Sequence, residues 1–360
     1  MLMSHSAPAR HSTPVLPPSV CASATLPSLM PSSLPRLILS LLLALTILVA
    51  GVACERPSPS AAASTPNTTT KQLNVVATIA MIGDVAANIG GPRVNVTNLM
   101  GEGVDPHLYK ASPGDVRILA DADVILYSGL HLEGRLADLL TRLAAKQTVL
   151  QVTASIDEAL LRQPPEFAGH FDPHVWFDVS LWSKTCASIR DVLIEKDPAG
   201  KDLYTANTLA YTSRLANLHA YATTTLATIP ASSRVMVTAH DAFGYFGRAY
   251  NLTVLGVQGI STDSEASLQD INKLVDTLVS NKVPAVFIES SVPRKTIDAL
   301  IEGSASRGHK LIIGGELYSD AMGAKGTPEG TYVGMVIHNV NIVTKSLGGT
   351  VPPTLPPPLQ

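Results

Sequence analysis

Residues 235–250 read VMVTAHDAFGYFGRAY, and this stretch contains the unit from which the fold is built. Residues 235–238 form a short apolar run rich in β-branched side chains, which is typical of a buried strand, and residues 242–250 predict a helix. The same order of strand and helix recurs along the chain, so we expect parallel sheets with helices on both faces. His240 lies between the two elements, at the strand end where α/β proteins place their ligands.

Two groups of four strands predict an α/β fold of two lobes, each a parallel sheet of about four strands flanked by helices. Strands are expected at residues 75–79, 94–99, 124–127, 149–152, 235–238, 254–257, 285–288 and 311–313. Helices are expected at residues 82–89, 113–120, 136–144, 242–250, 268–281, 293–307 and 329–347. We therefore assign residues 74–198 to an N-terminal lobe and residues 230–349 to a C-terminal lobe.

Residues 199–229, between the two groups, have the pattern of an amphipathic helix. Apolar side chains recur there at spacings close to three and four, from Leu203 and Leu209 to Leu218 and Leu226. One long helix would join the lobes more rigidly than a pair of strands. The alternative is two shorter helices separated by an unmarked turn.

The N-terminal residues 1–54 predict export from the cytoplasm. Residues 37–53 are almost entirely apolar, follow Arg36 and precede Cys54. This pattern resembles a bacterial lipoprotein signal in which Cys54 becomes the lipidated first residue. A plain signal anchor and a cleaved signal peptide are the alternatives, and all three would export the rest of the chain. Met30 would make a signal of ordinary proportions, so we suspect that it is the true start.

Composition bounds what the remaining segments can do. Residues 55–73 are dominated by Pro, Ser, Ala and Thr, which predicts a disordered tether, and the proline-rich residues 350–360 predict an unpacked tail. Cys186 is then the one cysteine of the folded body, so no disulfide can form there, and we expect it to be buried on a helix. The formal net charge of −3 argues against a nucleic-acid partner.

Four widely separated residues are candidate metal ligands: His107, His174, His240 and Asp320. Each follows an apolar strand or lies in a turn signal, and the order Asp-Pro-His occurs twice, at residues 105–107 and 172–174. Imidazole and carboxylate groups are common metal ligands, and two candidates fall in each lobe. A metal held by all four would keep the cleft between the lobes closed. The remaining histidines of the body lack comparable settings and are interpreted as surface or structural residues: His131, His170, His219, His309 and His338.

Three acidic residues could orient the ligands from behind, namely Glu289, Asp241 and Glu265. Each lies near a predicted strand end of the C-terminal lobe and could accept a hydrogen bond from an imidazole. Asp241 and Glu265 also precede helices and could cap them instead, and capping is our preferred role for Asp241. Glu289 ends an apolar strand and is the better candidate for orienting a ligand.

Several ordered motifs resemble one known family over about residues 74–347. They are VDPHLY at 104–109, ADVI at 122–125, GLHLE at 129–133, DPHVW at 172–176, TAHDAFGYF at 238–246, QGIST at 258–262 and SDAMG at 319–323. The family is that of the TroA-like zinc and manganese solute-binding lipoproteins of ABC importers, also called cluster A-I. The resemblance implies two α/β lobes joined by one long helix. It also places metal ligands at the positions of His107, His174, His240 and Asp320.

The same resemblance implies capture and delivery of a metal without turnover. The transported ligand would be Zn²⁺ or Mn²⁺, and the partners would be a membrane permease with its cytoplasmic ATPase. The protein would be a monomer anchored outside the cytoplasm by its lipid. His240 stands where some manganese proteins of the family have Glu, and residues 163–169 lack the His-rich tract of many zinc proteins, so the metal stays open.

Two other classes of function are compatible with a metal site. A secreted zinc-dependent hydrolase would need an open coordination position and a general base, and the sequence has no His-Glu-x-x-His motif. A surface adhesin would use the metal structurally and bind a host macromolecule. Metal-dependent turnover would identify the first, and chelator-sensitive capture of a macromolecule would identify the second.

Overall fold

The computed structural model describes residues 71–167 and 169–359. The predicted signal segment, with Cys54 and Met30, and most of the predicted tether lie outside these residues. None of the helices in the described part combines the length and the apolar character that a membrane span requires. The tether was expected to reach residue 73, but Leu73 is already the first residue of a strand.

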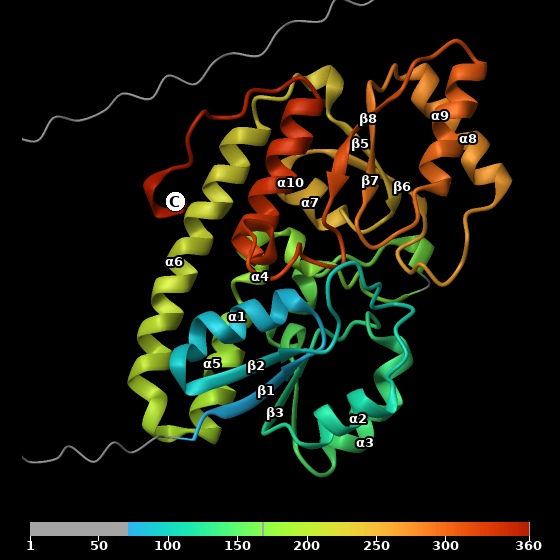
Figure 1. Cartoon of the computed structure of the whole chain (residues 1–360). Coiled ribbons are helices and arrows are strands. Elements are labelled where there is room, and N and C mark those ends of the chain that lie inside the picture. The colour runs from blue at the N-terminus through green and yellow to red at the C-terminus, as the bar shows by residue number, and fades with distance from the viewer. Residues whose placement is uncertain (1–70, 168, 360) are drawn as a thin grey trace, which may run out of the picture. The chain divides into compact units, whose positions relative to one another are not determined.

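The N-terminal lobe is built on a parallel sheet of four strands, as expected, and their order is β2-β1-β3-β4. Figure 1 labels the first three of these strands. The strands are β1 (Leu73–Ala77), β2 (Val94–Asn98), β3 (Val124–Tyr127) and β4 (Thr148–Gln151). The helices are α1 (Ala80–Gly90), α2 (Pro113–Ala120), α3 (Ala137–Ala144), α4 (Val179–Trp182) and α5 (Thr185–Lys196). Cys186 lies in α5, is fully buried and forms no disulfide, as predicted.

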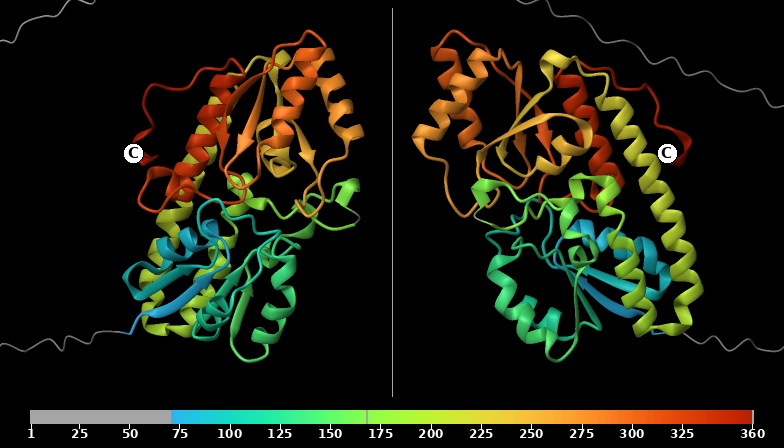
Figure 2. Two further views of the ribbon diagram at one scale, coloured as in Figure 1. Left: turned by 45° about the vertical axis from the view of Figure 1, so that its right-hand side comes forward. Right: turned by 180° about the vertical axis from the view of Figure 1, so that it is seen from behind.

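The linking segment is one continuous helix, α6 (Lys201–Leu226), and the alternative of two shorter helices is wrong. Its 26 residues span about 39 Å at the rise of an α-helix. The helix packs against α1 and α5 and also against α10 (Tyr332–Ser346) of the C-terminal lobe, and both views in Figure 2 show it running past the two groups of strands. Its buried face differs in part from the expected one, because Leu209 is 68% exposed whereas Tyr204 and Tyr211 are buried.

The C-terminal lobe also contains four parallel strands, but they form two hydrogen-bonded pairs instead of one continuous sheet. The strands are β5 (Val235–His240), β6 (Thr253–Gln258), β7 (Ala285–Glu289) and β8 (Ile312–Leu317). The helices are α7 (Gly244–Tyr250), α8 (Leu268–Ser280), α9 (Lys295–Ser306) and α10 (Tyr332–Ser346). β5 pairs with β6 and β7 pairs with β8, while β5 and β7 lie side by side. The carboxyl ends of β5, β7 and β8 point toward the N-terminal lobe in Figure 1.

The prediction of an unpacked C-terminal tail is wrong. The tail ends in a short 3-10 turn (Pro357–Leu359) that contacts α6, and Leu359 is 3% exposed. Leu355 also packs on the same apolar core. The leucines between the prolines supply apolar surface, and an extended proline-rich chain needs no hydrogen bonds of its own, so it can lie along a helix.

Candidate metal centre

The four predicted ligands come together between the lobes. His107 lies in the loop after β2, His174 just before a 3-10 turn (Val175–Phe177), His240 at the end of β5 and Asp320 after β8. One donor atom of each lies within 4.8 Å of the others. All four residues are buried, with at most 3% of their surface exposed. Two of them precede α6 and two follow it, as expected, so the cluster depends on both lobes.

Each Asp-Pro-His segment forms the same local turn. The Oδ1 atom of Asp105 accepts the backbone N–H of His107 at 2.9 Å, and Oδ1 of Asp172 accepts that of His174 at 3.0 Å. The proline between them restricts the backbone, so each histidine leaves its turn in a defined direction. The sequence analysis did not predict that the two aspartates shape these turns, although the repeated tripeptide was a signal of it.

The three imidazoles present their Nε2 atoms to the Asp320 carboxylate. Oδ2 of Asp320 lies 3.2 Å from Nε2 of His240 and 3.7 Å from Nε2 of His107. Oδ1 lies 3.4 Å from Nε2 of His174. Despite these short separations, both Asp320 oxygens and both His240 nitrogens lack a hydrogen bond of proper geometry within the described residues. Buried polar atoms are rarely left in this state. A divalent cation bound by the three Nε2 atoms and the carboxylate would satisfy the Asp320 oxygens and Nε2 of His240, whereas Nδ1 of His240 faces Glu289.

Two buried carboxylates stand behind the imidazoles on the side away from the cluster. Oδ1 of Asp172 lies 2.8 Å from Nδ1 of His174, and Oε2 of Glu289 lies 2.6 Å from Nδ1 of His240. Oε1 of Glu289 also accepts the backbone N–H of His240 at 2.9 Å. A carboxylate at Nδ1 holds the ring orientation and leaves Nε2 free to bind a metal. Glu289 therefore lies behind a candidate ligand, as the sequence predicted, whereas the similar position of Asp172 was not predicted.

The other two acidic candidates do not orient ligands. Asp241 was expected to cap the following helix, but α7 begins only at Gly244 with Phe243 at its N-cap and no side-chain cap, so this expectation is wrong. The reason is that β5 continues to His240 and a short turn separates the two elements. Glu265 is exposed, and the cap of α8 is Ser267, which accepts the N–H of Asp270.

Burial and neighbouring charges shift the pKa values of the clustered residues. Burial lowers the pKa of His107 to about 3, so this imidazole is neutral at physiological pH. Burial also disfavours a charge on His174, but Asp320 and Asp172 outweigh it and raise the pKa of His174 to about 9. Burial would raise the pKa of Asp320, yet the charges of His240 and His174 hold it well below its ordinary value. A metal would therefore displace a proton from His174 as it binds, whereas the neutral His107 could bind it directly.

Two side-chain contacts join the loop after β6 to the N-terminal lobe, and one of them reaches the loop that carries His107. The hydroxyl of Thr262 donates to Oδ2 of Asp105 at 2.6 Å, while the other oxygen of Asp105 shapes the His107 turn. Next to it, Asp263 pairs with Arg135 of the N-terminal lobe at 2.7 Å. The loop after β6 thus contacts Asp105, the residue that orients the ligand His107 of the opposite lobe.

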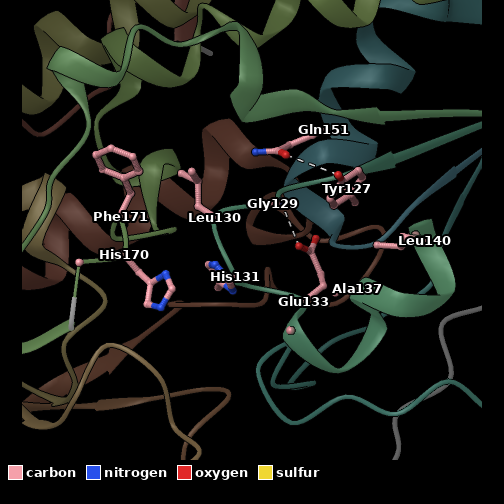
Figure 3. A pocket seen from close by; sticks show the side chains of 12 residues that line it. Tyr127, Gly129, Leu130, His131, Glu133, Ala137, Leu140, Gln151, His170 and Phe171 are labelled. Atoms are coloured by element: carbon pink, nitrogen blue, oxygen red, sulfur yellow. Dashed lines mark hydrogen bonds between the residues drawn. The ribbon is translucent and has the colours of Figure 1, made fainter. Parts of the chain in front are cut away.

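A second cavity, of about 430 Å³, opens beside the end of β3 (Figure 3). His131 and His170 line it side by side, in edge contact with their ring centroids 4.2 Å apart, and both are exposed. Beneath them the buried Glu133 accepts the N–H groups of Ser128 and Gly129. Both histidines lie outside the ligand cluster, which agrees with their interpretation as surface or structural residues.

The profile of the family described as "Zinc-uptake complex component A periplasmic" matches residues 75–346. This match includes both lobes, the linking helix and all four clustered residues. The chain belongs to this family. Membership identifies the chain as a metal-capturing, substrate-binding component of an ABC transporter.

Two named relatives and one solved structure are similar to this chain over most of their own length. The manganese-binding lipoprotein MntA of Bacillus subtilis is 49% identical, over 77% of this chain and 90% of its own. The zinc-binding protein TroA of Treponema pallidum is 47% identical, over 76% of this chain and 88% of its own. The solved structure of periplasmic TroA from T. pallidum superposes with a TM-score of 0.75 at 46% identity, covering 77% of this chain and 99% of that one.

Proposed function

We propose that this protein captures Zn²⁺ or Mn²⁺ between its lobes and delivers the ion to an ABC importer. His107, His174, His240 and Asp320 are the proposed ligands, with Glu289 and Asp172 orienting two of the imidazoles. The ion is cargo: it exchanges its water for the four side chains, and the loaded protein docks on a membrane permease driven by a cytoplasmic ATPase.

The observation that carries this proposal is the convergence of four buried side chains from both lobes, with Asp320 oxygens that face three imidazole nitrogens but form no hydrogen bond within the described part of the chain. Burying an unsatisfied neutral acceptor costs about 1–3 kcal/mol and burying an ionised carboxylate costs more, so a bound cation would offset a large penalty at Asp320. Because two ligands belong to each lobe, the ion itself stabilises the closed arrangement. Opening the lobes would separate the ligand pairs and release the ion.

The choice between zinc and manganese follows from the donor set only in part. Three imidazoles and one carboxylate can complete a tetrahedral zinc site, and a bidentate Asp320 would raise the coordination number toward that of manganese. The manganese-binding and zinc-binding relatives are almost equally similar to this chain, at 49% and 47% identity. We therefore propose both ions as cargo, with zinc bound more tightly on the usual divalent series.

A carrier explains the site better than an enzyme does. Catalytic zinc keeps an open position for water or substrate, with a general base beside it. Here the four side chains would suffice for a tetrahedral shell without an open position, and none is more than 3% exposed. We accordingly propose that the protein performs no turnover, and a secreted hydrolase is not favoured.

The proposed location is the outer face of the membrane. MntA of B. subtilis is named a lipoprotein, and Cys54 follows an apolar segment that suits lipidation. Residues 55–73 would then tether the N-terminal lobe (74–198), the linking helix (199–229) and the C-terminal lobe (230–349) to the membrane as a monomer. Radiolabelled palmitate incorporation, lost in Cys54→Ala, would test the anchor.

Metal titration by calorimetry tests the function directly. We expect His107→Ala and His174→Ala to weaken zinc binding by orders of magnitude, because each removes a buried ligand. His338→Ala is the matched control, since this histidine lies outside the cluster and bonds the Glu316 carbonyl at 2.9 Å. Unchanged binding in His107→Ala and His174→Ala, with the fold confirmed by circular dichroism, would refute the assignment.

A further inference from the structure

We propose that Arg162 is a positioning residue for the metal site, acting on His174 through Asp172. This inference rests on the proposed function, because it concerns the orientation of a proposed ligand. Arg162 lies in the segment that precedes His174, outside the ligand cluster, with its side chain 24% exposed. Its guanidinium pairs through Nη1 with Oδ2 of Asp172, whose side chain is fully buried.

The two oxygens of Asp172 have separate tasks. Oδ1 accepts the backbone N–H of His174 at 3.0 Å and lies 2.8 Å from its Nδ1 atom. Oδ2 is held by the Arg162 guanidinium. Since a carboxylate is planar, fixing Oδ2 fixes the direction of Oδ1, and this direction sets the plane of the imidazole. A lysine could supply charge here but not the flat geometry of a guanidinium.

The backbone ties the same two residues together. The N–H of Asp172 donates to the Arg162 carbonyl at 2.8 Å, and the Tyr245 hydroxyl both accepts the Arg162 N–H at 3.0 Å and donates to the Asp172 carbonyl at 2.9 Å. Tyr245 belongs to α7 of the C-terminal lobe. The arginine therefore sits where the two lobes touch, and its position depends on their contact.

Gly244 makes room for the guanidinium. A Cβ atom added to Gly244 would overlap Nη1 and Cζ of Arg162, so even alanine would displace the guanidinium from its position beside Asp172. The backbone of Gly244 does not have a positive φ, and the need for glycine here comes from this close approach. The glycine of the TAHDAFGYF motif thus has a specific reason: it leaves the space from which Arg162 reaches Asp172.

The test compares two arginines that flank one tyrosine. Arg162 and Arg248 both lie over the Tyr245 ring, at 5.7 and 4.9 Å from its centroid, but Arg162 is the one that pairs with Asp172. We expect Arg162→Met to weaken zinc binding by about 10–100-fold, the range for loss of a group that orients a ligand. Arg162→Lys should restore part of this loss, and Arg248→Met should stay within about twofold of the wild type, a difference of under 0.5 kcal/mol.

Two further variants separate positioning from a general structural role. Gly244→Ala keeps the arginine but displaces it, so it should weaken zinc binding in the same direction as Arg162→Met. In an Asp172→Asn background, Arg162→Met should add no further loss, because the arginine acts through that carboxylate. Zinc dissociation constants come from competition with a chromophoric chelator on full-length mature protein, with folding checked by circular dichroism.

The outcomes are distinct. Wild-type affinity in Arg162→Met, equal losses in Arg162→Met and Arg248→Met, or additive losses with Asp172→Asn would each overturn the role of Arg162. If Arg162→Met does not fold, the comparison of Arg162→Lys and Gly244→Ala with the wild type decides by the same criterion. Absence of zinc and manganese binding by the wild type and by Arg248→Met would instead reject the proposed function itself.

Discussion

Replacing Glu289 with alanine should weaken zinc binding through His240 without touching a ligand. Both oxygens of Glu289 serve His240, one at the backbone N–H (2.9 Å) and one near Nδ1 (2.6 Å), and both side chains are fully buried. Loss of such an orienting carboxylate lowers metal affinity by about 10–100-fold, which corresponds to about 1.4–2.7 kcal/mol. The free energy of unfolding should also fall by about 1–3 kcal/mol, because a buried N–H loses its acceptor.

The assay measures the zinc dissociation constant by chelator competition and the unfolding free energy by urea titration in the presence of a chelator. Glu289→Gln keeps one acceptor for the backbone N–H, so we expect a smaller stability loss than in Glu289→Ala with a comparable loss of affinity. Glu316→Ala is the control: it lies on the paired strand β8, opposite Ile288, and is exposed. It should change neither quantity.

A double variant shows whether the effect passes through His240. In a His240→Ala background, Glu289→Ala should cost little additional affinity, since the imidazole that it orients is gone. The reasoning is refuted if Glu289→Ala binds zinc within about twofold of the wild type while His240→Ala does not. It is equally refuted if the losses from the two substitutions add.

Two other predictions concern protons and the contact between lobes. Below about pH 9 zinc must displace a proton from His174, so affinity should rise toward pH 9 by up to about tenfold per pH unit for each proton. Because the pKa of His174 is raised on folding, it stabilises the metal-free protein fully below pH 6.5, and this stability is lost as the pH rises through about 9. Calorimetric melting in the presence of a chelator should therefore show Tm falling over this range, and a rising Tm would contradict the prediction. Thr262→Ala removes the bond to Asp105, worth about 1 kcal/mol, and should speed zinc release about fivefold in stopped-flow measurements, with Thr262→Ser restoring the slow rate. Equal rates in all three proteins would exclude this contact from release.

Local patterns predicted most of the elements and the four candidate ligands. Strand and helix periods depend on neighbouring residues, so the linking helix and seven others were predicted in the correct order, and β3 and α2 with their observed bounds, whereas no range was predicted for α4 or α5. The four ligand candidates stood out because each followed a strand or a turn, and because parallel strands end at the same edge of a sheet. The repeated Asp-Pro-His was also the signal that its aspartates accept the backbone N–H of the histidines. Only the contacts in the structure reveal which atom each aspartate binds.

Features that depend on distant contacts could not be read from local pattern. The period of α6 marked Leu209 as apolar but not as exposed, because a helix that touches two lobes does not bury one uniform stripe. Leu359 looked like part of a free tail because nothing near it in sequence shows that α6 offers an apolar surface. The two pairs of strands in the C-terminal lobe likewise depend on how β5 and β7 meet.

The sequence by itself therefore determined the class of fold, the family and the identity of the four candidate ligands, because these follow from local periodicity and short motifs. Only the tertiary structure decided that three Nε2 atoms meet an Asp320 carboxylate without hydrogen bonds, that Asp172 and Glu289 stand behind two of the rings, and that Gly244 leaves room for a guanidinium. Orientation and close approach are set by side chains far apart in the chain, and no spacing along the chain records them.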